Sequence, residues 1–290
     1  MAETAATDPL HGQRWDGQLG RDWAERAGAL ERQLAPVATL ALGLLDAAPG
    51  ERIIDLGCGH GPTTEALALA VGPSGRVTGI DISPELAAMA RARLERHAQA
   101  EVVLADAATH AFAPGACDAL FSRMGCMFFE DAAAAFTNLR AALRPGGRVV
   151  LACFRGMEAN PWAMLPVRLA EPVLGPAVAS TPGLPGPFGW AASRVFEPAL
   201  KAAGFHDIAW AAHDRRFALS LGDDPDPCRR AAALMIGMGP LGRRLRALSE
   251  AERAPAAAEV ERLLVQGLAP HVEDGMVHLD ARLWIVTART

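Results

Sequence analysis

The residues best suited to ligand chemistry form one short stretch, in which an apolar run is followed by an acidic residue and three spaced glycines. The stretch has the sequence Ile-Ile-Asp-Leu-Gly-Cys-Gly-His-Gly over residues 53–61, and Pro62 follows it. Glycines permit positive φ and let a ligand lie against bare backbone, and proline suits the first position of a helix. The pattern predicts a buried strand, a nucleotide-binding turn and a helix that ends before Gly72.

The glycine spacing bears on the kind of nucleotide. A dinucleotide site has glycines at the first, third and sixth positions of the turn, with the pyrophosphate over the helix N-terminus. Here Gly61 stands at the fifth position and Pro62 at the sixth. Asp55 also places a carboxylate where a pyrophosphate would be repelled and a cationic group attracted. The spacing therefore disfavours an NAD-dependent oxidoreductase, which stays an alternative.

Two more acidic residues stand at the ends of predicted strands. Asp81 ends the second strand, 20 positions after Gly61, and Ser83 is placed to cap the next helix. A carboxylate at the tip of the second strand of a βαβ unit can accept both hydroxyls of a ribose. Asp106 ends the third strand, where an adenine amino group needs an acceptor. The alternative is that these are ordinary solvated strand ends.

With these motifs the chain resembles the class I S-adenosylmethionine-dependent methyltransferases, of the small-molecule type similar to quinone-biosynthesis methyltransferases. The resemblance is strong over about residues 35–155 and implies S-adenosylmethionine as cofactor. It implies an α/β fold, Rossmann-like, with a seven-stranded, mostly parallel sheet. The last strand would be antiparallel, between the fifth and sixth, with helices on both faces and a helical lid or insertion. Four motifs carry it: IIDLGCGHG at 53–61, TGIDIS at 78–83, LADA at 104–107, and the stretch from FSRMGCMFF at 121–129 to LRPGGRVVL at 143–151.

The resemblance also implies roles for single residues. The glycines of the turn would pass under the methionine part of the cofactor, Asp55 would lie near its ammonium group, and Asp81 would hold the ribose. Asp106 and the residue after it would face the adenine, and Arg123 and the residue before it would lie beside the sulfonium and the acceptor. The implied cofactor-binding residues are Asp55, Gly57, Cys58, Gly59, Gly61, Thr64, Asp81, Ile82, Asp106, Ala107, Ser122 and Arg123.

Aromatic and apolar residues gather after the fourth strand, in the proline-rich segment that follows the fifth, and near the amino terminus. Loops at the carboxyl ends of parallel strands line the ligand crevice, so we expect a hydrophobic or aromatic acceptor. The alternative is that these side chains only pack a lid onto the core. The expected substrate-pocket residues are Trp15, Met127, Phe128, Trp162, Phe188 and Trp190.

Composition and periodicity divide the chain into segments. We expect an N-terminal helical cover, a cofactor-binding core, a lid and a helical insertion, with two further segments that complete the core. In that order the expected ranges are 1–34, 35–155, 156–192 and 223–274, and the completing segments are 193–222 and 275–290.

Overall composition agrees with a soluble enzyme, which we expect to be cytoplasmic, and the resemblance implies a small-molecule acceptor. The chain has 290 residues, 51% of them hydrophobic, and a net charge of −5, which offers no attraction to nucleic acid. No apolar run is long enough for a membrane span, and the start lacks the features of a signal peptide. The five cysteines lack the paired spacing of zinc sites, so no metal is expected. The oligomeric state, monomer or homodimer, stays open.

No catalytic residue is assigned by the sequence. The chain has no tyrosine, so a general base would have to be His, Asp, Glu or Cys. The candidates that could approach the site are His11, His60 and Glu130. Methyl transfer depends mainly on positioning, so an absent base is compatible with the reaction. A cofactor-binding protein of the same fold that transfers no methyl group is a further alternative.

Overall fold

The structure, a computed structural model, describes residue 15 and residues 17–177 and 183–290. At its centre lies one sheet with the strand order β3-β2-β1-β4-β5-β8-β6, and a short strand β7 pairs with β8. β8 runs antiparallel to β5 and β6, whereas β1 to β5 pair in parallel. The predicted sheet, with its last strand antiparallel between the fifth and sixth, is confirmed. The strands are β1 (Arg52–Leu56), β2 (Arg76–Asp81), β3 (Ala100–Leu104), β4 (Cys117–Arg123), β5 (Leu143–Phe154), β6 (His206–Leu219), β7 (Val272–Glu273) and β8 (Met276–Arg289).

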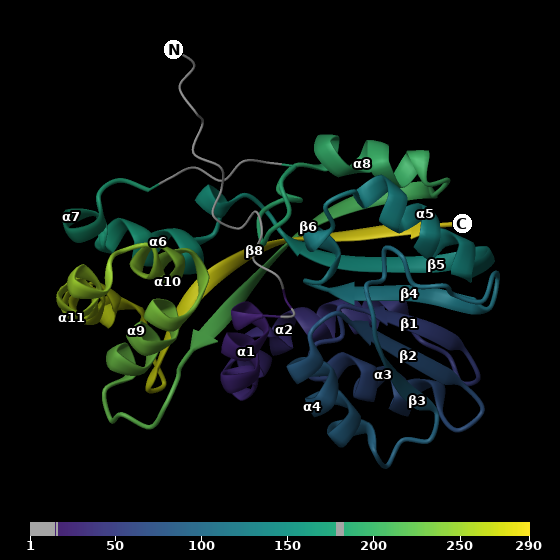
Figure 1. The fold of residues 1–290 in the computed structure, drawn as a ribbon, viewed down its shortest axis with the longest axis horizontal. Helices are drawn as coiled ribbons and strands as arrows, with labels where there is room; N and C mark the ends of the chain where they lie inside the picture. Colours follow the sequence, from purple (N-terminus) through teal and green to yellow (C-terminus); the bar gives the residue numbers. More distant parts are fainter. Residues whose placement is uncertain (1–14, 16, 178–182) are drawn as a thin grey trace.

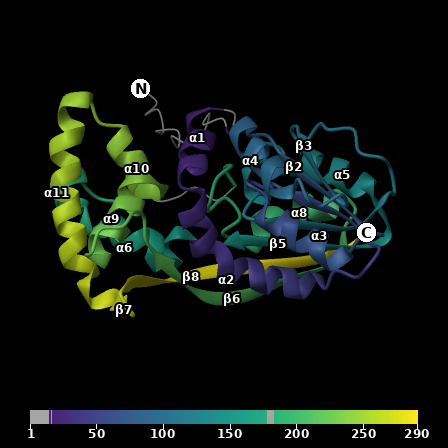
Figure 2. The same cartoon turned by 90° about the horizontal axis from the view of Figure 1, so that it is seen from below.

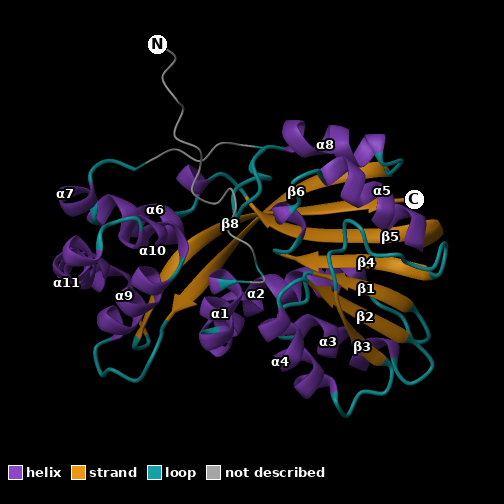
Figure 3. Cartoon of the chain, in the orientation of Figure 1, coloured by secondary structure: helices purple, strands orange, loops and turns teal. Residues whose placement is uncertain are grey.

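Helices cover both faces of this sheet (Figures 1 and 3). The chain moves along the sheet in one direction from β1 to β2 and in the other from β4 to β5. Since parallel crossovers are right-handed, the helices of these two connections, α3 and α5, lie on opposite faces. α2 packs beside α3, and α8 packs beside α5. The bounds are α2 (Ala27–Leu45), α3 (Pro62–Val71), α4 (Pro84–Leu94), α5 (Ala132–Ala142) and α8 (Ser193–Ala202).

A second group of helices lies on the far halves of β6 and β8, which project beyond β5 (Figures 1 and 2). α1 lies between this group and the core, and three short 3-10 turns complete the described elements. The group thus adds walls beside the carboxyl ends of the core strands. The bounds are α1 (Gln18–Glu25), α6 (Pro161–Leu169), α7 (Glu171–Leu174), α9 (Pro227–Gly237), α10 (Gly239–Arg246), α11 (Glu250–Leu268), η1 (Cys126–Phe128), η2 (Met157–Ala159) and η3 (Ala269–His271).

The helix starts follow the local signals in the sequence. Pro62 occupies the first position of α3, after Gly61 in the left-handed region. Ser83 caps α4 by accepting a hydrogen bond from the backbone N–H of Leu86 at 3.4 Å. Asp131 caps α5 in the same way, accepting from Ala134 at 2.9 Å. These caps fix where the loops after β1, β2 and β4 end.

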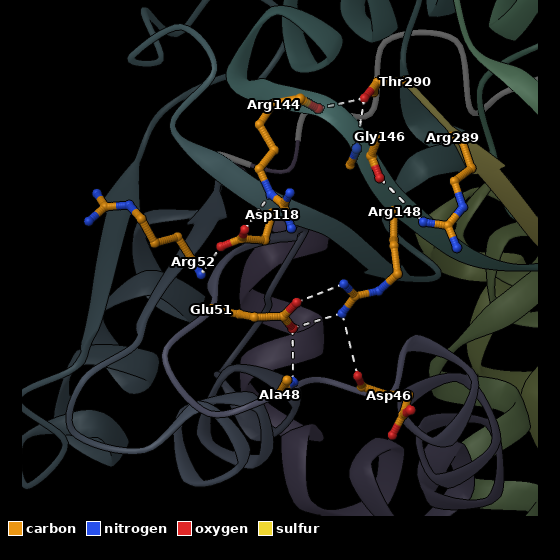
Figure 4. Close-up of polar contacts among 11 residues, drawn as sticks. Asp46, Ala48, Glu51, Arg52, Asp118, Arg144, Gly146, Arg148, Arg289 and Thr290 are labelled. Carbon is orange, nitrogen blue, oxygen red and sulfur yellow. Dashed lines mark hydrogen bonds and ion pairs between the residues drawn. The ribbon is translucent and has the colours of Figure 1, made fainter.

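The amino-terminal edge of the sheet is held by a network of charged and polar groups (Figure 4). Arg148 donates two hydrogen bonds to the Glu51 carboxylate, both 2.7 Å long. Asp118 accepts from the backbone N–H of Arg52 at 2.7 Å and from the side chain of Arg144. These bonds join β1, β4 and β5 at the amino-terminal ends of the strands, away from the glycine turn. We therefore assign them a role in the stability of the sheet.

Two further observations concern the expected segments. α2 runs without a break from Ala27 to Leu45, so the expected border between cover and core at residue 34 falls inside one helix. Across the described residues, every helix is too short or too polar to span a bilayer.

Candidate ligand site at the carboxyl ends of the strands

Two adjoining cavities open where the core strands end. The larger has a volume of about 650 Å³ and lies at the carboxyl ends of β1, β2 and β4 and the loop after β3. The smaller has a volume of about 120 Å³ and lies among α1, α2, α9 and α10. The residues that line both join them into one site: Trp15, Leu19, Trp23, Leu30, Leu34, Met124 and Phe128.

The turn after β1 approaches the loop after β4 so closely that neither side can carry a side chain. A Cβ atom on Gly57 would lie 2.7 Å from the Cα atom of Gly125, and Gly57 has a φ of +66°. The hydroxyl of Ser122 donates to the carbonyl of Leu56 at 2.8 Å and locks the same crossing. The bare backbone of the turn therefore forms the floor of the larger cavity.

Asp81 is fixed beside this turn by two backbone groups. Its Oδ2 atom accepts from the N–H of Gly59 at 2.8 Å, and its Oδ1 atom accepts from the N–H of Ser83 at 2.9 Å. Burial raises the pKa of the Asp81 carboxyl. A carboxylate oxygen can accept more than one hydrogen bond, so both oxygens can still accept from a diol in the cavity.

The loop after β3 forms the next wall. Asp106 accepts from the backbone N–H of Ala108 at 2.8 Å. Asn138, on α5, donates to the carbonyls of Ala107 and His110 at 3.0 and 2.9 Å. This role of Asn138 was not identified from the sequence. The feature that could have indicated it is a single amide on an otherwise apolar face of the helix. It holds the loop so that Asp106 and Ala107 line the larger cavity.

Asp55 lies beneath the turn rather than on the cavity. It is completely buried, and its Oδ2 atom accepts from the hydroxyls of Thr63 and Thr64 at 2.8 and 2.7 Å. Its Oδ1 atom has no hydrogen-bond partner among the described residues, and burial raises its pKa. Through these two hydrogen bonds Asp55 fixes the first turn of α3 beneath the glycine turn.

The expected cofactor residues thus divide into two groups. Five of them, unlike the rest, do not line either cavity: Asp55, Cys58, Gly61, Thr64 and Ser122. These residues lie on the side of the turn that faces away from the cavities, where Asp55, Thr64 and Ser122 make hydrogen bonds that fix it. The larger cavity is lined by the others, Gly57, Gly59, Asp81, Ile82, Asp106, Ala107 and Arg123.

Arg123 brings a positive charge to the larger cavity. Its Nε atom is buried and has no hydrogen-bond partner in the described part of the chain. Burial lowers its pKa, opposed by the charges of Asp55 and Glu31, and a guanidinium stays charged regardless. The carboxylates that line the same cavity are those of Glu31, Asp81, Asp106, Glu130 and Asp131.

Glu31 connects α2 to the turn and to α4, which the sequence did not indicate. It accepts two hydrogen bonds from Arg93, at 3.0 and 2.8 Å, and its Oε2 atom lies 3.0 Å from Nε2 of His60. The hydrogen bonds from Arg93 lower the pKa of Glu31 to about 2. Burial lowers the pKa of His60 despite this partner.

The three candidate bases have different positions. His60 lines the larger cavity but is engaged by Glu31. Glu130 also lines that cavity and is exposed. His11 lies outside the described residues.

The smaller cavity is apolar and aromatic. Of the expected pocket residues, Trp15, Met127, Phe128 and Trp162 line it. Trp15 meets Trp23 and Phe128 edge to face, at ring-centre distances of 5.4 and 5.0 Å. Side chains that the sequence did not single out come from α2, α9 and α10: Leu30, Gln33, Leu34, Leu234, Met235 and Leu241.

Two expected pocket residues lie elsewhere. Phe188 is buried against Phe154 and Trp162, with ring centres 5.9 and 6.0 Å away. Trp190 stacks on Phe196 at 4.4 Å. Neither lines either of the two cavities described above, and their contact with an acceptor stays a prediction. Their rings pack the segment after β5 onto the core, as expected if these aromatic side chains serve packing.

Comparison with known proteins gives one family match. The family described as methyltransferase domain matches residues 53–147, from β1 into β5. This range contains the glycine turn and three residues of the larger cavity, Asp81, Asp106 and Arg123.

Similar proteins extend the match. Nocamycin O-methyltransferase of Saccharothrix syringae is 35% identical over 186 residues, which are 60% of this chain and 65% of that protein. Demethylmenaquinone methyltransferase of Lactococcus lactis is 35% identical over 103 residues, 35% of this chain and 41% of that protein. The chain covers only 33–65% of the length of the first curated relatives it matches.

Solved structures share the fold. A protein of Bacillus halodurans described as a methyltransferase superposes with a TM-score of 0.54 over 87% of this chain and 97% of that one. The sequence identity is 15%, so this likeness bears on the fold alone.

Proposed function

We propose that this chain methylates a small, apolar molecule with S-adenosylmethionine as donor, since residues 53–147 match the family described as methyltransferase domain. One observation supports this most directly. A polar cavity suited to a nucleoside adjoins an apolar cavity, and shared residues such as Met124 and Phe128 line both. The two partners of a transfer reaction need such adjoining sites.

The residues of the larger cavity suit the parts of S-adenosylmethionine. Asp81 would accept the ribose hydroxyls, and Asp106 the adenine amino group. The bare backbone at Gly57 and Gly59 would lie against the methionine part. Arg123, with its unpartnered Nε atom, would bind the methionine carboxylate at the junction with the acceptor.

The chain's part in the reaction is to position and to exclude water. When bound, S-adenosylmethionine would supply a methyl group that passes to a nucleophilic atom of the acceptor, while the bond from methyl to sulfur breaks and the sulfur keeps the electron pair. The apolar walls of the smaller cavity would hold the acceptor at the junction beside Met124. Positioning of this kind can lower the barrier by about 7–11 kcal/mol, so the reaction does not depend on a general base.

The proposal includes a small-molecule acceptor, no nucleic-acid substrate and a cytoplasmic location. The enclosure of the smaller cavity among α1, α2, α9 and α10 supports a small acceptor, and the net charge of −5 argues against nucleic acid.

Calorimetry with S-adenosylmethionine and S-adenosylhomocysteine tests the proposal on wild type and Asp81→Ala. We expect wild type to bind both, and Asp81→Ala to bind about 10- to 100-fold more weakly, since hydrogen bonds to a charged group are worth about 1.5–3 kcal/mol. Asp223→Ala, which changes an exposed aspartate, is the matched control and should bind like wild type.

Three results would contradict the proposal in different ways. Wild type that binds neither ligand sinks it. Tight binding of NAD would favour the oxidoreductase alternative. Cofactor binding without methyl transfer in a broad acceptor screen would favour a non-catalytic cofactor-binding protein.

A further inference from the structure

The smaller cavity is lined by a side-chain amide that has no hydrogen-bond partner in the described part of the chain. Gln33 lies on α2, is only 6% exposed and lines the cavity among apolar side chains. It makes no hydrogen bond to any residue that the structure describes. The other buried polar side chains of the described chain all make at least one: Asp55, His60, Thr63, Thr64, Ser83, Ser122, Asn160 and Thr290.

With no partner among the described residues, the amide can be satisfied only by water or by a ligand inside the cavity. Buried polar groups are almost always paired, and an unpaired one calls for an explanation. A ligand that supplies the missing partner is such an explanation. A site built to hydrogen-bond a ligand rejects analogues that lack the bonding group, because its own polar group is then left unpaired.

Two other polar side chains on the cavity wall are already engaged. Arg246 donates to the carbonyl of Gly237 at 3.1 Å and lies 3.9 Å from the Asp22 carboxylate. The indole N–H of Trp162 donates to Asn160 at 3.1 Å. Gln33 is different because its amide can both donate and accept.

The position of Gln33 relative to the junction says which part of a ligand it would contact. Leu30 and Leu34, its neighbours on α2, line both cavities, whereas Gln33 lines only the smaller one. A group that bonds Gln33 therefore lies away from the larger cavity, and away from the atom that receives the methyl group.

We propose that Gln33 is a specificity-determining residue that hydrogen-bonds a carbonyl or hydroxyl oxygen of the acceptor, distinct from the methylated atom. The acceptor class is then a small apolar ring compound with two polar groups, one at the junction and one inside the smaller cavity. This proposal rests on the proposed function, which provides the larger cavity with its cofactor.

The test uses three probes of matched shape: indane, 1-indanone and 5-indanol. Binding is measured by calorimetry and by tryptophan fluorescence, since Trp15, Trp23 and Trp162 line the cavity, with and without saturating S-adenosylhomocysteine. We expect wild type to bind 1-indanone or 5-indanol at least about tenfold more tightly than indane. Gln33→Leu should lose this preference and bind indane as tightly as wild type or more tightly.

The thermal stability of the ligand-free protein separates a ligand-binding role from a structural one. Gln33→Leu should keep or raise the Tm, because it removes an unpaired amide. Asn160→Leu is the matched control: its amide donates to the carbonyls of Arg155 and Gly156 and accepts from the N–H of Arg282. This variant should lower the Tm.

Several results would overturn the role of Gln33. These are equal affinities of wild type for the three probes, no binding of any probe, an unchanged preference in Gln33→Leu, or a loss of Tm in Gln33→Leu as large as in Asn160→Leu. Binding of S-adenosylhomocysteine is measured separately. Its absence contradicts the proposed methyltransferase function, whereas its presence with equal probe affinities contradicts only the role of Gln33.

Discussion

At the scale of single residues, the site combines paired and unpaired polar groups. Asp81 is held by two backbone N–H groups and is ready to accept more hydrogen bonds. Arg123 lines the larger cavity and Gln33 the smaller, and the Nε atom of Arg123 and the amide of Gln33 have no hydrogen-bond partner among the described residues. An unpaired polar group in a cavity lowers the stability of the free protein, and a ligand that bonds it removes this penalty. Such groups therefore indicate where a ligand would bind.

Arg123→Met should weaken S-adenosylhomocysteine binding about tenfold or more, since it removes a charge-assisted bond to the carboxylate. Binding of 5′-methylthioadenosine, which lacks the amino-acid part, should stay unchanged. Competition calorimetry with both ligands measures the two effects.

Two further variants support the comparison. Arg123→Lys keeps the positive charge near the buried Asp55 and should show a smaller loss than Met. Arg91→Met, on the exposed face of α4, should leave both ligands unaffected. Equal losses for both ligands in Arg123→Met would mean that the side chain acts on the fold of the site and not on the carboxylate.

At the scale of elements, the glycine turn is held from outside as well as from below. Glu31 of α2 reaches His60 in the turn and Arg93 of α4. It therefore joins three elements that the sequence places far apart. The pKa of Glu31 is lowered, so this bond is fully present above the ordinary pKa of a glutamate and is lost as the pH falls through the lowered value of about 2.

Glu31→Gln should lower the Tm at neutral pH by a few degrees. The Glu31 side chain is 35% exposed, so we expect a contribution of about 1 kcal/mol after solvent screening. The Tm difference between wild type and variant should shrink as the pH falls from about 5 towards 2. Thermal unfolding over this pH range measures it, with Glu259→Gln, from an exposed pair with Arg262, as the control without effect. A difference that does not depend on pH would show that charge is not the cause.

The same elements show what the sequence could and could not predict. Pro62, Ser83 and Asp131 mark helix starts by their own chemistry, so β1 to β5 and their helices were predictable. Glu31 and Gln33 lie on a helix with no local signal, and their roles depend on which elements pack against it. Phe188 and Trp190 show the converse, because aromatic side chains suit a core as well as a pocket.

At the scale of the whole molecule, the smaller cavity exists because two parts of the chain meet. Leu30 and Gln33 come from α2, at the core, whereas Leu234 and Met235 come from α9 in the helical group on β6 and β8. The larger cavity has no lining residue from α9 or α10. Substitutions in the helical group should therefore change the affinity for the acceptor and leave the affinity for the cofactor unchanged.

Met235→Trp fills the smaller cavity from α9 and should weaken 1-indanone binding at least about tenfold, because the larger ring occupies the probe's space. The affinity for S-adenosylhomocysteine should stay within about twofold of wild type, since Met235 does not line the larger cavity. Met89→Trp, on the exposed side of α4, is the matched control. Loss of both ligands in Met235→Trp would show that the two cavities are not independent.

The length of β6 and β8 has a consequence for how ligands enter. Their pairing continues without a break from Ala209 and Thr287 in the core to Leu219 and Val277 among the insertion helices. Bending the molecule between its two parts would break this ladder of hydrogen bonds, so the sheet acts as a stiff beam. Among the described residues α1 has no backbone pairing with the sheet, and it contacts its neighbours through side chains, such as those of Arg21 with Glu85 and of Asp22 with Arg246. A path to both cavities that leaves this strand pairing intact therefore runs past α1, whose displacement would break no pairing of strands.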